Sequence, residues 1–453
     1  MFFKQFSLDG LGCQSYLIGD KGVAAVVDPQ RDVDIYLDEA DAQELQITHV
    51  IETHLHADHV SGNTELAART GARIYVHAAA NALFPHEPLA AADEIAIGDV
   101  RLRVLFTPGH TPEHICLTVT DTSRSPEPWF ILTGDMLFVG DVGRPDLLGE
   151  AATRQLASQL YDSLHTQLLP LPDGLEVFPG HGAGSLCGRV MSSKLSTTVG
   201  FERRFNYALQ LQSREEFIQS LTSDMPAQPP NVPFLKKLNR EGPPVQGDLS
   251  PRPLNAAKVR RLLKGGALLV DTREPGAFGA GHAKGALCVP LSSNQFGTRL
   301  GFLVQPETPL VFVARNAADS LRAARAANRL GLDCIEGFIT VAEARRLPQA
   351  KMPQWDVRRA SRALASAGLT IVDVREKNEW EAGHAPGARN IPLGQLPARL
   401  AEVPSDEPVA CMCAGGVRSI SACSVLARAG YTNVVNVTGG FDQWAEEGLP
   451  VER

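Results

Sequence analysis

The sequence predicts a multidomain protein of the α/β class. Its 453 residues are enough for about three domains of ordinary size. In the first half, short apolar runs that predict strands alternate with segments that predict helices. In the second half, a stretch of roughly a hundred residues occurs twice, and each copy shows the same alternation. These observations together favour sheets covered by helices in every domain.

Composition and charge exclude several classes of protein. Hydrophobic residues make up 44% and charged residues 21%, as in ordinary globular proteins. The net charge of −8 argues against a nucleic-acid partner but leaves room for small anionic substrates in a local basic pocket. No apolar run approaches the ~20 residues that span a bilayer, and the first residues lack an apolar core long enough for a secretory signal. The eight cysteines form no disulfide framework or zinc ribbon. We therefore expect a cytoplasmic protein without a membrane partner, and we also expect a homo-oligomer.

The first half is organised around one short polar segment. His54, His56, Asp58 and His59 follow a predicted strand over residues 47–51. Histidine and aspartate supply the nitrogen and oxygen ligands that first-row metals bind. A solvated polar loop is the alternative, and this close spacing of four ligand types argues against it.

Three further ligand-type residues repeat one pattern. His110, Asp135 and His181 each follow an apolar strand, and a glycine stands directly before each of them. Glycine permits a tight turn and a close approach of the backbone to a bound ion. Four strand ends that carry histidine or aspartate are expected to converge at one edge of a sheet.

These seven residues resemble the metal-binding set of the metallo-β-lactamase superfamily, and the resemblance covers about residues 1–240. It implies a four-layer αβ/βα sandwich with metal at one edge of the paired sheets. The superfamily includes glyoxalase II thioesterases, other metal hydrolases and iron-dependent persulfide dioxygenases. The seven residues alone do not choose among these activities.

A second segment narrows the choice. Gly143, Arg144, Pro145 and Asp146 follow Asp135 as a Gly-Arg-x-Asp segment does in persulfide dioxygenases. This resemblance implies one Fe(II) per chain, with the ligands His54, His110 and Asp135. A triad of two histidines and one carboxylate leaves coordination positions open for a sulfur ligand and O₂. His56, Asp58, His59 and His181 then orient ligands or contact substrate. In a hydrolase with two Zn(II), the same four complete the metal sites.

Two other residues near this segment are candidates for the site. Arg144 either supports the metal ligands or pairs with a substrate carboxylate, and a surface salt bridge is the alternative. Cys187 lies six residues beyond His181 and resembles a segment of dioxygenase–sulfurtransferase fusions. It is a candidate for carrying or receiving sulfur, with a structural cysteine as the alternative.

The junction between the halves is rich in proline. Residues 189–225 have a helical pattern and are expected to close the first domain. The prolines that follow, from Pro226 to Pro253, predict an extended connector without a periodic element. We place the domain limits at 1–247, 248–350 and 351–453.

The second half contains an internal repeat. Residues 268–274 match residues 370–376, and residues 281–286 match residues 383–388, in both cases 102 positions apart. A unit of this length is a duplicated domain and not a solenoid repeat. Each copy alternates apolar strands with Ala-rich helices, which predicts a small α/β domain with a parallel sheet.

The last copy contains a candidate nucleophile, Cys413, between an apolar strand and a predicted helix. Gly415 and Gly416 follow it, and their backbone N–H groups are expected to bind an anion together with the helix dipole. Both effects favour a reactive thiolate that accepts sulfur as a persulfide. Arg418 is placed to position an anionic sulfur substrate. This Cys-x₄-Arg loop and the segment Asp373-x-Arg375-Glu376 resemble rhodaneses, which implies sulfur transfer.

The middle copy departs from the rhodanese pattern. Aligned at a separation of 99 positions, Ala314 replaces Cys413 and Asp319 replaces Arg418. Cys288 and Cys334 lie outside the loop. We therefore predict an inactive rhodanese-like domain that serves as a spacer, an interface or a docking surface.

The resemblances imply oxidation of a low-molecular-weight persulfide, such as glutathione persulfide, by O₂ to sulfite and the free thiol. Transfer of sulfur from Cys413 to sulfite then gives thiosulfate. The opposite order, in which the rhodanese prepares the persulfide, fits the sequence equally well. Two alternatives stay open: a glyoxalase II-like thioesterase with two Zn(II), and a sulfur relay or sensor without enzymatic activity.

Overall fold

The computed structural model describes residues 1–8, 10–185, 187–189, 191–223, 225, 228–247, 249–366 and 368–453. The chain divides into two compact units, Met1–Gly247 with Arg329–Gly331, and Asp248–Asn328 with Leu332–Arg453. Pro226 and the predicted boundary at Asp248 lie outside the described residues, and the three domain limits stay predictions. None of the helices in the described ranges has the length and apolar character that a membrane crossing requires.

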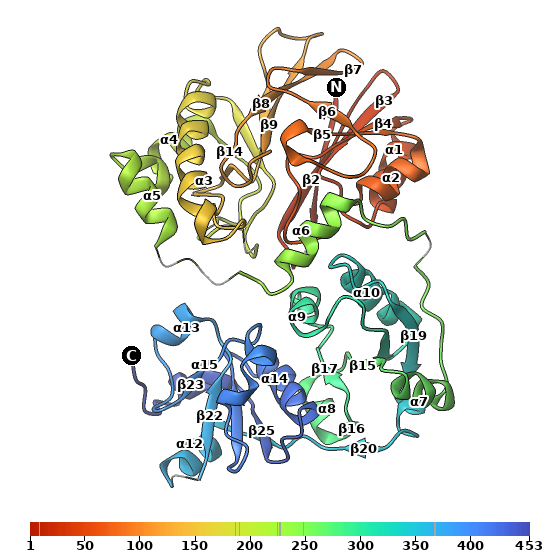
Figure 1. Ribbon diagram of the computed structural model, residues 1–453, viewed down its shortest axis with the longest axis vertical. Helices are drawn as coiled ribbons and strands as arrows, with labels where there is room; N and C mark the ends of the chain where they lie inside the picture. The colour runs from red at the N-terminus through yellow and green to blue at the C-terminus, as the bar shows by residue number, and fades with distance from the viewer. Residues whose placement is uncertain are drawn as a thin grey trace. The chain divides into compact units, whose positions relative to one another are not determined.

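Two six-stranded sheets form the centre of the first unit (Figure 1). The first sheet has the order β1 (Phe2–Leu8), β2 (Cys13–Asp20), β3 (Val23–Val27), β4 (Gln46–Ile51), β5 (Arg73–His77) and β6 (Glu87–Leu89). The second has the order β14 (Thr197–Thr198), β13 (Glu176–Pro179), β10 (Phe130–Gly134), β9 (Ile115–Asp121), β8 (Val100–Phe106) and β7 (Glu94–Ile97). A short hairpin follows β10, with β11 (Leu137–Phe138) and β12 (Asp141–Val142).

The first unit has four layers, in which the two sheets pack against each other and helices cover their outer faces. Along β2, Tyr16 and Ile18 pack in the core between the two sheets, whereas Leu17 packs in the cluster on the outer face. The helices α1 (Asp34–Ala42) and α2 (Asn63–Thr70) cover that face. The helix α3 (Glu150–Ser163) and the π-helical turn η2 (Leu164–Leu168) cover the outer face of the second sheet together with α5 (Arg214–Thr222). The predicted αβ/βα sandwich is confirmed.

The predicted connector contains a helix, α6 (Val232–Glu241), that the proline pattern hid. Pro233 lies in its first turn, where a backbone N–H has no partner within the helix and proline is tolerated. Val232, Leu235 and Asn239 are buried at helical spacing. The prediction of a connector without a periodic element is therefore wrong over these residues. Among the described residues of 189–225, the first helix is α4 (Val199–Phe205), and the 3₁₀ turn η3 (Tyr207–Gln210) and α5 follow it.

The second unit contains two sheets in which all strand pairs are parallel. The first has the order β17 (Leu287–Cys288), β15 (Leu268–Asp271), β18 (Leu310–Ala314) and β19 (Ile335–Thr340). The second has the order β21 (Gln354–Trp355), β25 (Val434–Val437), β24 (Val409–Met412), β22 (Thr370–Asp373) and β23 (Arg389–Asn390). Because helices cover both faces, strands such as β15 and β24 are buried along their whole length. The predicted parallel sheets are confirmed.

Helices and short strands complete the two copies. The middle copy contains α7 (Ala256–Lys264), α8 (Pro275–Ala280), α9 (Phe296–Leu303), α10 (Ala317–Asn328), α11 (Val341–Ala344) and the pair β16 (His282–Ala283) and β20 (Gln349–Ala350). The last copy contains α12 (Val357–Ala365), α13 (Lys377–Glu381), α14 (Val417–Arg428), α15 (Gly440–Glu446) and the 3₁₀ turns η4 (Leu396–Ala398) and η5 (Leu400–Glu402). A further 3₁₀ turn of the first unit is η1 (Ala78–Ala80).

The repeated Asp-x-Arg segment has the same structural role in both copies. Arg273 donates a hydrogen bond to the carbonyl oxygen of Gly281 at 3.0 Å, and Arg375 donates one to that of Gly383 at 2.8 Å. Each guanidinium also pairs with the aspartate two residues before it. The duplicated residues therefore join the end of β15 to the segment after α8, and the end of β22 to the segment after α13.

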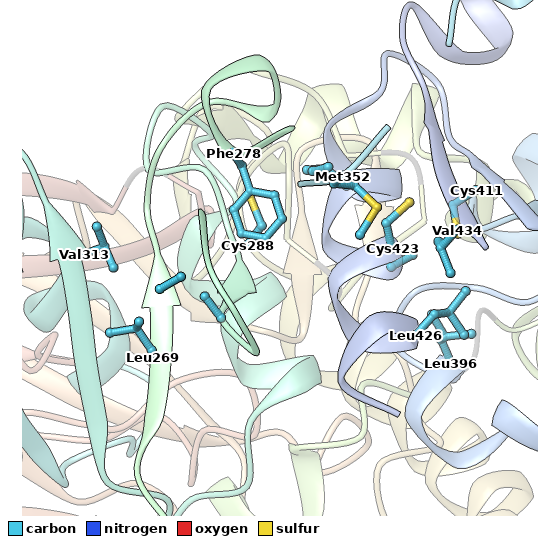
Figure 2. Close-up of a cluster of buried hydrophobic side chains, with 14 of the residues drawn as sticks. Leu269, Phe278, Cys288, Val313, Met352, Leu396, Cys411, Cys423, Leu426 and Val434 are labelled. Atoms are coloured by element: carbon cyan, nitrogen blue, oxygen red, sulfur yellow. The ribbon is translucent and has the colours of Figure 1, made fainter. Parts of the chain in front are cut away.

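One apolar cluster joins the two copies within the second unit. Figure 2 shows Phe278 and Cys288 of the middle copy beside Met352 and Cys423. The helix α14 packs against β17, and the N–H of Cys288 donates to Ser424 Oγ at 3.0 Å. The two copies therefore form one packed body, with α14 at their junction.

Candidate functional site: a metal centre and a cysteine loop

Four loops at one edge of the two sheets bring predicted ligands together. His54 follows β4, His110 follows β8, Asp135 follows β10 and His181 follows β13. The parallel pairing of β10 with β13 places the last two side by side. Each of the four is at most 1% exposed. The predicted convergence of these strand ends is therefore present in the fold.

Three of these side chains converge on one point. Asp135 Oδ2 lies 3.4 Å from His110 Nε2 and 3.8 Å from His54 Nε2, and the three ligand atoms all lie within 4.8 Å of one another. The opposite ring nitrogens are already bonded, His54 Nδ1 to Thr53 Oγ1 at 2.9 Å and His110 Nδ1 to a carbonyl at 2.9 Å. His110 Nε2 and Asp135 Oδ2 are buried and have no hydrogen-bond partner in the described chain. Two nitrogens and one oxygen presented in this way fit a single metal ion.

Electrostatics keeps these groups in the protonation states that a metal needs. Burial holds the pKa of His54 well below its ordinary value and also lowers that of His110, so both imidazoles are neutral. Burial raises the pKa of the Asp135 carboxyl, but His181, His54 and His110 outweigh this effect and bring the pKa below its ordinary value, so the carboxylate is ionised. Neutral histidine and ionised aspartate are the ligating forms.

His56 lies beside this triad but presents its ring to other groups. Its Nε2 is 3.3 Å from Asp28 Oδ1 and 3.2 Å from Glu52 Oε2. Burial lowers the pKa of His56, but the two carboxylates raise it well above the ordinary value. The ring nitrogen therefore belongs to an ion-pair group and not to the group of His54 and His110.

The remaining predicted residues form a second group with Cys13. His181 lies between two carboxylates, with Nδ1 2.6 Å from Asp135 Oδ1 and Nε2 2.8 Å from Asp58 Oδ2. The other oxygen of Asp58 lies 3.0 Å from His59 Nδ1. The Cys13 thiol donates a hydrogen bond to Asp58 Oδ2, with 3.2 Å between the sulfur and the oxygen. The candidate ligand atoms of Asp58, His59, His181 and Cys13 are therefore already hydrogen-bonded to one another.

Arg144 supports the triad through its backbone. Its carbonyl oxygen lies 2.9 Å from His110 Nδ1, which orients that ring. Its guanidinium makes two hydrogen bonds of 2.6 and 2.7 Å to Asp146. The Arg144 side chain is 4% exposed, so this is a buried ion pair and not a surface salt bridge. A Cβ at Gly143 would overlap the Asp135 carbonyl oxygen, which explains why glycine precedes Arg144.

Cys187 is buried close to the metal edge. Its carbonyl accepts the N–H of Arg144 at 3.1 Å, and its Sγ lies within 4.8 Å of ligand atoms of Asp135 and His181. Burial raises the pKa of the Cys187 thiol well above its ordinary value, although His181 lowers it. The thiol form is a weak nucleophile. A sulfur-carrying role for Cys187 stays a prediction.

The loop of Cys413 has the expected strand–loop–helix arrangement. Cys413 follows β24 directly, and α14 begins at Val417. Gly416 has a φ of 90° and donates its N–H to Cys413 Sγ at 3.1 Å. Ser419 Oγ lies 3.5 Å from the same sulfur. A Cβ at Gly415 would meet no atom within 4 Å, so the backbone of the loop is open at this position. A negative charge on the sulfur is stabilised by this N–H and by the start of α14.

Arg418 is held by a carboxylate that the sequence analysis did not single out. Its guanidinium donates two hydrogen bonds of 2.6 Å to Glu379 on α13. Burial lowers the pKa of Arg418, but Glu379 raises it above the ordinary value. The predicted anion-binding cation is therefore already paired in this structure.

The N-terminus of α15 fixes the cysteine loop from the other side. The N–H of Phe441 donates to the Cys413 carbonyl at 2.7 Å, and that of Asp442 donates to the Ala414 carbonyl at 3.1 Å. Gly440 has a φ of 59°, and a Cβ there would collide with the Ala414 carbonyl oxygen. The consecutive glycines Gly439 and Gly440 are the feature of the sequence that could have indicated this close approach of two backbone segments.

The middle copy has the same loop position without a thiol. Ala314 is the last residue of β18, where Cys413 follows β24 in the last copy. Arg315 and Asp319 pair with each other across this loop. Cys288 is buried in the shared core and Cys334 is exposed elsewhere. The inactivity of this copy stays a prediction.

The comparisons with known proteins agree with this architecture. Residues 8–181 match the model of the Metallo-beta-lactamase superfamily, and residues 255–340 and 356–447 match the Rhodanese-like domain. A solved metallo-beta-lactamase from Staphylococcus aureus subsp. aureus COL is 32% identical, covers 75% of this chain and 99% of its own, and superposes with a TM-score of 0.67. The chain belongs to the metallo-β-lactamase superfamily and carries two rhodanese-like domains. The family prediction is confirmed.

Two further relatives match the metallo-β-lactamase domain. The hydroxyacylglutathione hydrolase of Polaromonas sp. is 36% identical over 172 residues, which are 37% of this chain and 61% of that protein. The chain thus spans less than two thirds of the hydrolase. The solved structure of ETHE1 from Myxococcus xanthus is 32% identical, covers 53% of this chain and 98% of its own, and has a TM-score of 0.46. The family is therefore known, whereas the reaction has to be argued from the site.

Sequence reasoning missed several residues of the metallo-β-lactamase domain that support the metal edge. His114 accepts the N–H of Asp135 at 2.9 Å through Nε2, and the Cys13 thiol contacts Asp58. Asn239 of α6 donates to the carbonyls of His56 and His59, both at 2.7 Å, and accepts the Ser61 N–H at 2.9 Å. Asn239 lies at helical spacing from the buried Val232 and Leu235, but the sequence does not show which segment it contacts.

Asn239→Leu is expected to loosen the loop that carries His54 and His56. The variant leaves buried backbone groups unpaired, at a cost of about 1–3 kcal/mol for each. Hydrogen exchange at the amide of Ser61 and in residues 54–60 should accelerate, while that of β24 in the last rhodanese-like domain should not change. Lys237→Ala, on the exposed side of α6, is the matched control. Unchanged exchange in residues 54–61 would show that Asn239 does not stabilise the loop.

Proposed function

We propose that the metallo-β-lactamase domain is a persulfide dioxygenase and that the last rhodanese-like domain is a sulfurtransferase. In the first reaction, a low-molecular-weight persulfide, O₂ and water give the free thiol and sulfite. In the second, the Cys413 thiolate takes a sulfane sulfur from a donor and passes it to sulfite, which gives thiosulfate and restores the thiolate. The proposed cofactor is one Fe(II) per chain, held by His54, His110 and Asp135.

The observation that carries this proposal is the separation of His56 from the triad. The three ligand atoms of His54, His110 and Asp135 form one group, whereas His56 Nε2 lies against Asp28 and Glu52. This arrangement supports a centre of two histidines and one carboxylate. Fe(II) bound there supplies open coordination positions for the persulfide sulfur and for O₂. A first metal site with three histidines, as the zinc alternative needs, would require His56 to leave both carboxylates.

The surrounding residues prepare this centre. Thr53 and the Arg144 carbonyl orient the two imidazoles so that each Nε2 faces Asp135. His181 lies between Asp135 and Asp58 and orients the Asp135 carboxylate through Oδ1, which leaves Oδ2 for the metal. Burial of all these groups excludes bulk water from the centre.

The sulfurtransferase part of the proposal is supported by the loop of Cys413. The Gly416 N–H and the start of α14 stabilise the negative sulfur of a thiolate or a persulfide. The site that forms sulfite and the site that consumes it are part of one chain, which raises the effective concentration of sulfite at Cys413.

The second candidate is a thioesterase with two Zn(II), supported by the likeness to hydroxyacylglutathione hydrolases and by the presence of all seven ligand-type residues. Metal analysis separates the two candidates. The dioxygenase requires about one iron per chain and O₂ consumption with glutathione persulfide, whereas the thioesterase requires two zinc ions and hydrolysis of S-lactoylglutathione. A protein that uses no O₂ and hydrolyses no thioester would instead be a sulfur relay or sensor.

His56→Gln distinguishes the two metal centres within one chain. If the triad holds the iron, the variant should retain about one iron per chain, and its O₂ consumption should fall by no more than about a hundredfold, because His56 is not itself a ligand. His54→Gln, two residues away, should lose the iron and is the matched comparison. Elemental analysis and an oxygen electrode give both readouts. Loss of metal in His56→Gln to the level of His54→Gln would favour the zinc centre.

A further inference from the structure

In the described part of the middle rhodanese-like domain, a half-buried arginine has two buried side-chain nitrogens without a hydrogen-bond partner. Arg299 lies on α9, and its Nε and Nη1 atoms are buried and make no hydrogen bond within the described chain. Buried guanidinium groups are normally paired, because a charged donor without a partner is costly. Arg299 is therefore a candidate for binding an anion that comes from a bound substrate and not from the chain itself.

The helix α9 and the helix that begins at the cysteine loop share one apolar core. Phe296 and Leu300 of α9 belong to the core of the middle domain, and Val425 of α14 packs against that same core. Arg299 precedes Leu300 and follows Phe296 by three positions, so it lies at the flank of this buried face. The loop that carries Cys413 leads directly into α14.

The charges of Arg299, Arg418 and Cys413 influence one another. Burial lowers the pKa of Arg299, the cationic Arg418 lowers it further, and Cys413 raises it. The charge of Arg418 is balanced by Glu379, to which its guanidinium donates two hydrogen bonds. In this neighbourhood, Arg299 is therefore the guanidinium that still has free donors for an anion bound at Cys413.

We propose that Arg299 of the middle domain binds the sulfonate group of an anionic sulfur substrate at Cys413 of its duplicate. This inference rests on the proposed sulfurtransferase function and adds a substrate-binding residue from the duplicate domain. In the reverse of the transfer proposed above, the Cys413 thiolate attacks the outer sulfur of thiosulfate, the S–S bond of thiosulfate breaks, and sulfite leaves with the electron pair. Arg299 and the Gly416 N–H then hold opposite ends of the reacting anion. The domain that lacks a nucleophile thus completes the site of the domain that has one.

Kinetics of full-length variants test this assignment. Arg299→Ala should raise the KM for thiosulfate by about tenfold or more, the loss expected for one charge-assisted hydrogen bond, with a smaller effect on kcat. Arg299→Lys should recover part of the loss. The cationic donor 2-aminoethyl persulfide has no sulfonate, so its transfer to Cys413, followed as added sulfur by mass spectrometry, should be unchanged. Arg315→Ala, in the loop of the middle domain itself, is the control.

Equal losses with both donors would mean that Arg299 has only a structural role, and no loss with thiosulfate would mean that it does not bind substrate. Either result overturns the assignment. A second readout does not depend on sulfur transfer: sulfite should protect Cys413 from alkylation by iodoacetamide in the unmodified protein and much less in Arg299→Ala. Protection without any sulfur transfer would retain the anion site and reject the proposed function. Absence of protection in the unmodified protein would reject the anion site.

Discussion

Asp135→Asn is expected to lose bound iron and O₂ consumption together, the latter by more than about a hundredfold. Substitution of groups that only support metal ligands costs about ten- to a hundredfold, and Asp135 is placed as a ligand itself. The amide has nearly the same shape as the carboxylate but no charge. It therefore removes the anion that faces His54 Nε2 and His110 Nε2, with little change in volume. Elemental analysis of the purified variant and an oxygen electrode measure the two losses.

A matched control separates this effect from general damage. Asp141 is also fully buried and lies on β12, and its carboxylate accepts the N–H of Val142 at 2.8 Å. It belongs to none of the candidate metal groups among the described residues. Asp141→Asn should therefore retain the iron, even if the domain becomes less stable. Iron retained in Asp135→Asn, or lost equally in both variants, would contradict the ligand role of Asp135.

Sequence patterns predicted many of the strands, helices and buried faces, because each of these patterns depends on residues that are neighbours along the chain. The alternation along β2 and the buried length of β24 determine which faces of these strands are covered. The position of a ligand just after a strand was equally visible, since strands end at predictable residues. The repeat of the second half could be read directly, because the duplicated Asp-x-Arg segments perform the same local task.

What the sequence did not reveal depends on contacts between distant segments. Asn239 contacts the loop of His56 from a helix about 180 positions away, and no local pattern announces such a partner. The helix α6 itself was hidden because prolines outweighed the helical spacing of Val232, Leu235 and Asn239. The pairing of Arg418 with Glu379 likewise needs the folded sheet, since the two residues come from different crossovers.

The sequence also could not predict which histidines face the metal triad and which face other carboxylates. His54 and His56 are two positions apart and identical in type, yet one faces Asp135 and the other faces Asp28 and Glu52. Asp28 and Glu52 lie at the ends of β3 and β4, and neither belongs to a recognisable motif. The choice between one metal and two therefore depends on carboxylates whose approach is set by strand pairing.

Cys413→Ser is expected to abolish sulfur transfer, by at least about a thousandfold, as removal of a nucleophile does in enzymes that act through one. The hydroxyl cannot form a persulfide, although it can still accept the Gly416 N–H. If the two domains are coupled as proposed, O₂ consumption should continue and the product should change from thiosulfate to sulfite. Chromatographic quantification of both anions after a fixed consumption of O₂ measures this change.

The comparison variant is Cys334→Ser, which removes an exposed thiol far along the chain from the loop and should leave the products unchanged. Two results would contradict the coupled pathway in different ways. Thiosulfate formation by Cys413→Ser would mean that another group transfers the sulfur, and Cys187 near the metal edge would then be the thiol to replace next. Loss of O₂ consumption in Cys413→Ser would instead support the opposite order of the two reactions, since the rhodanese-like domain would then supply the persulfide that the metal domain oxidises.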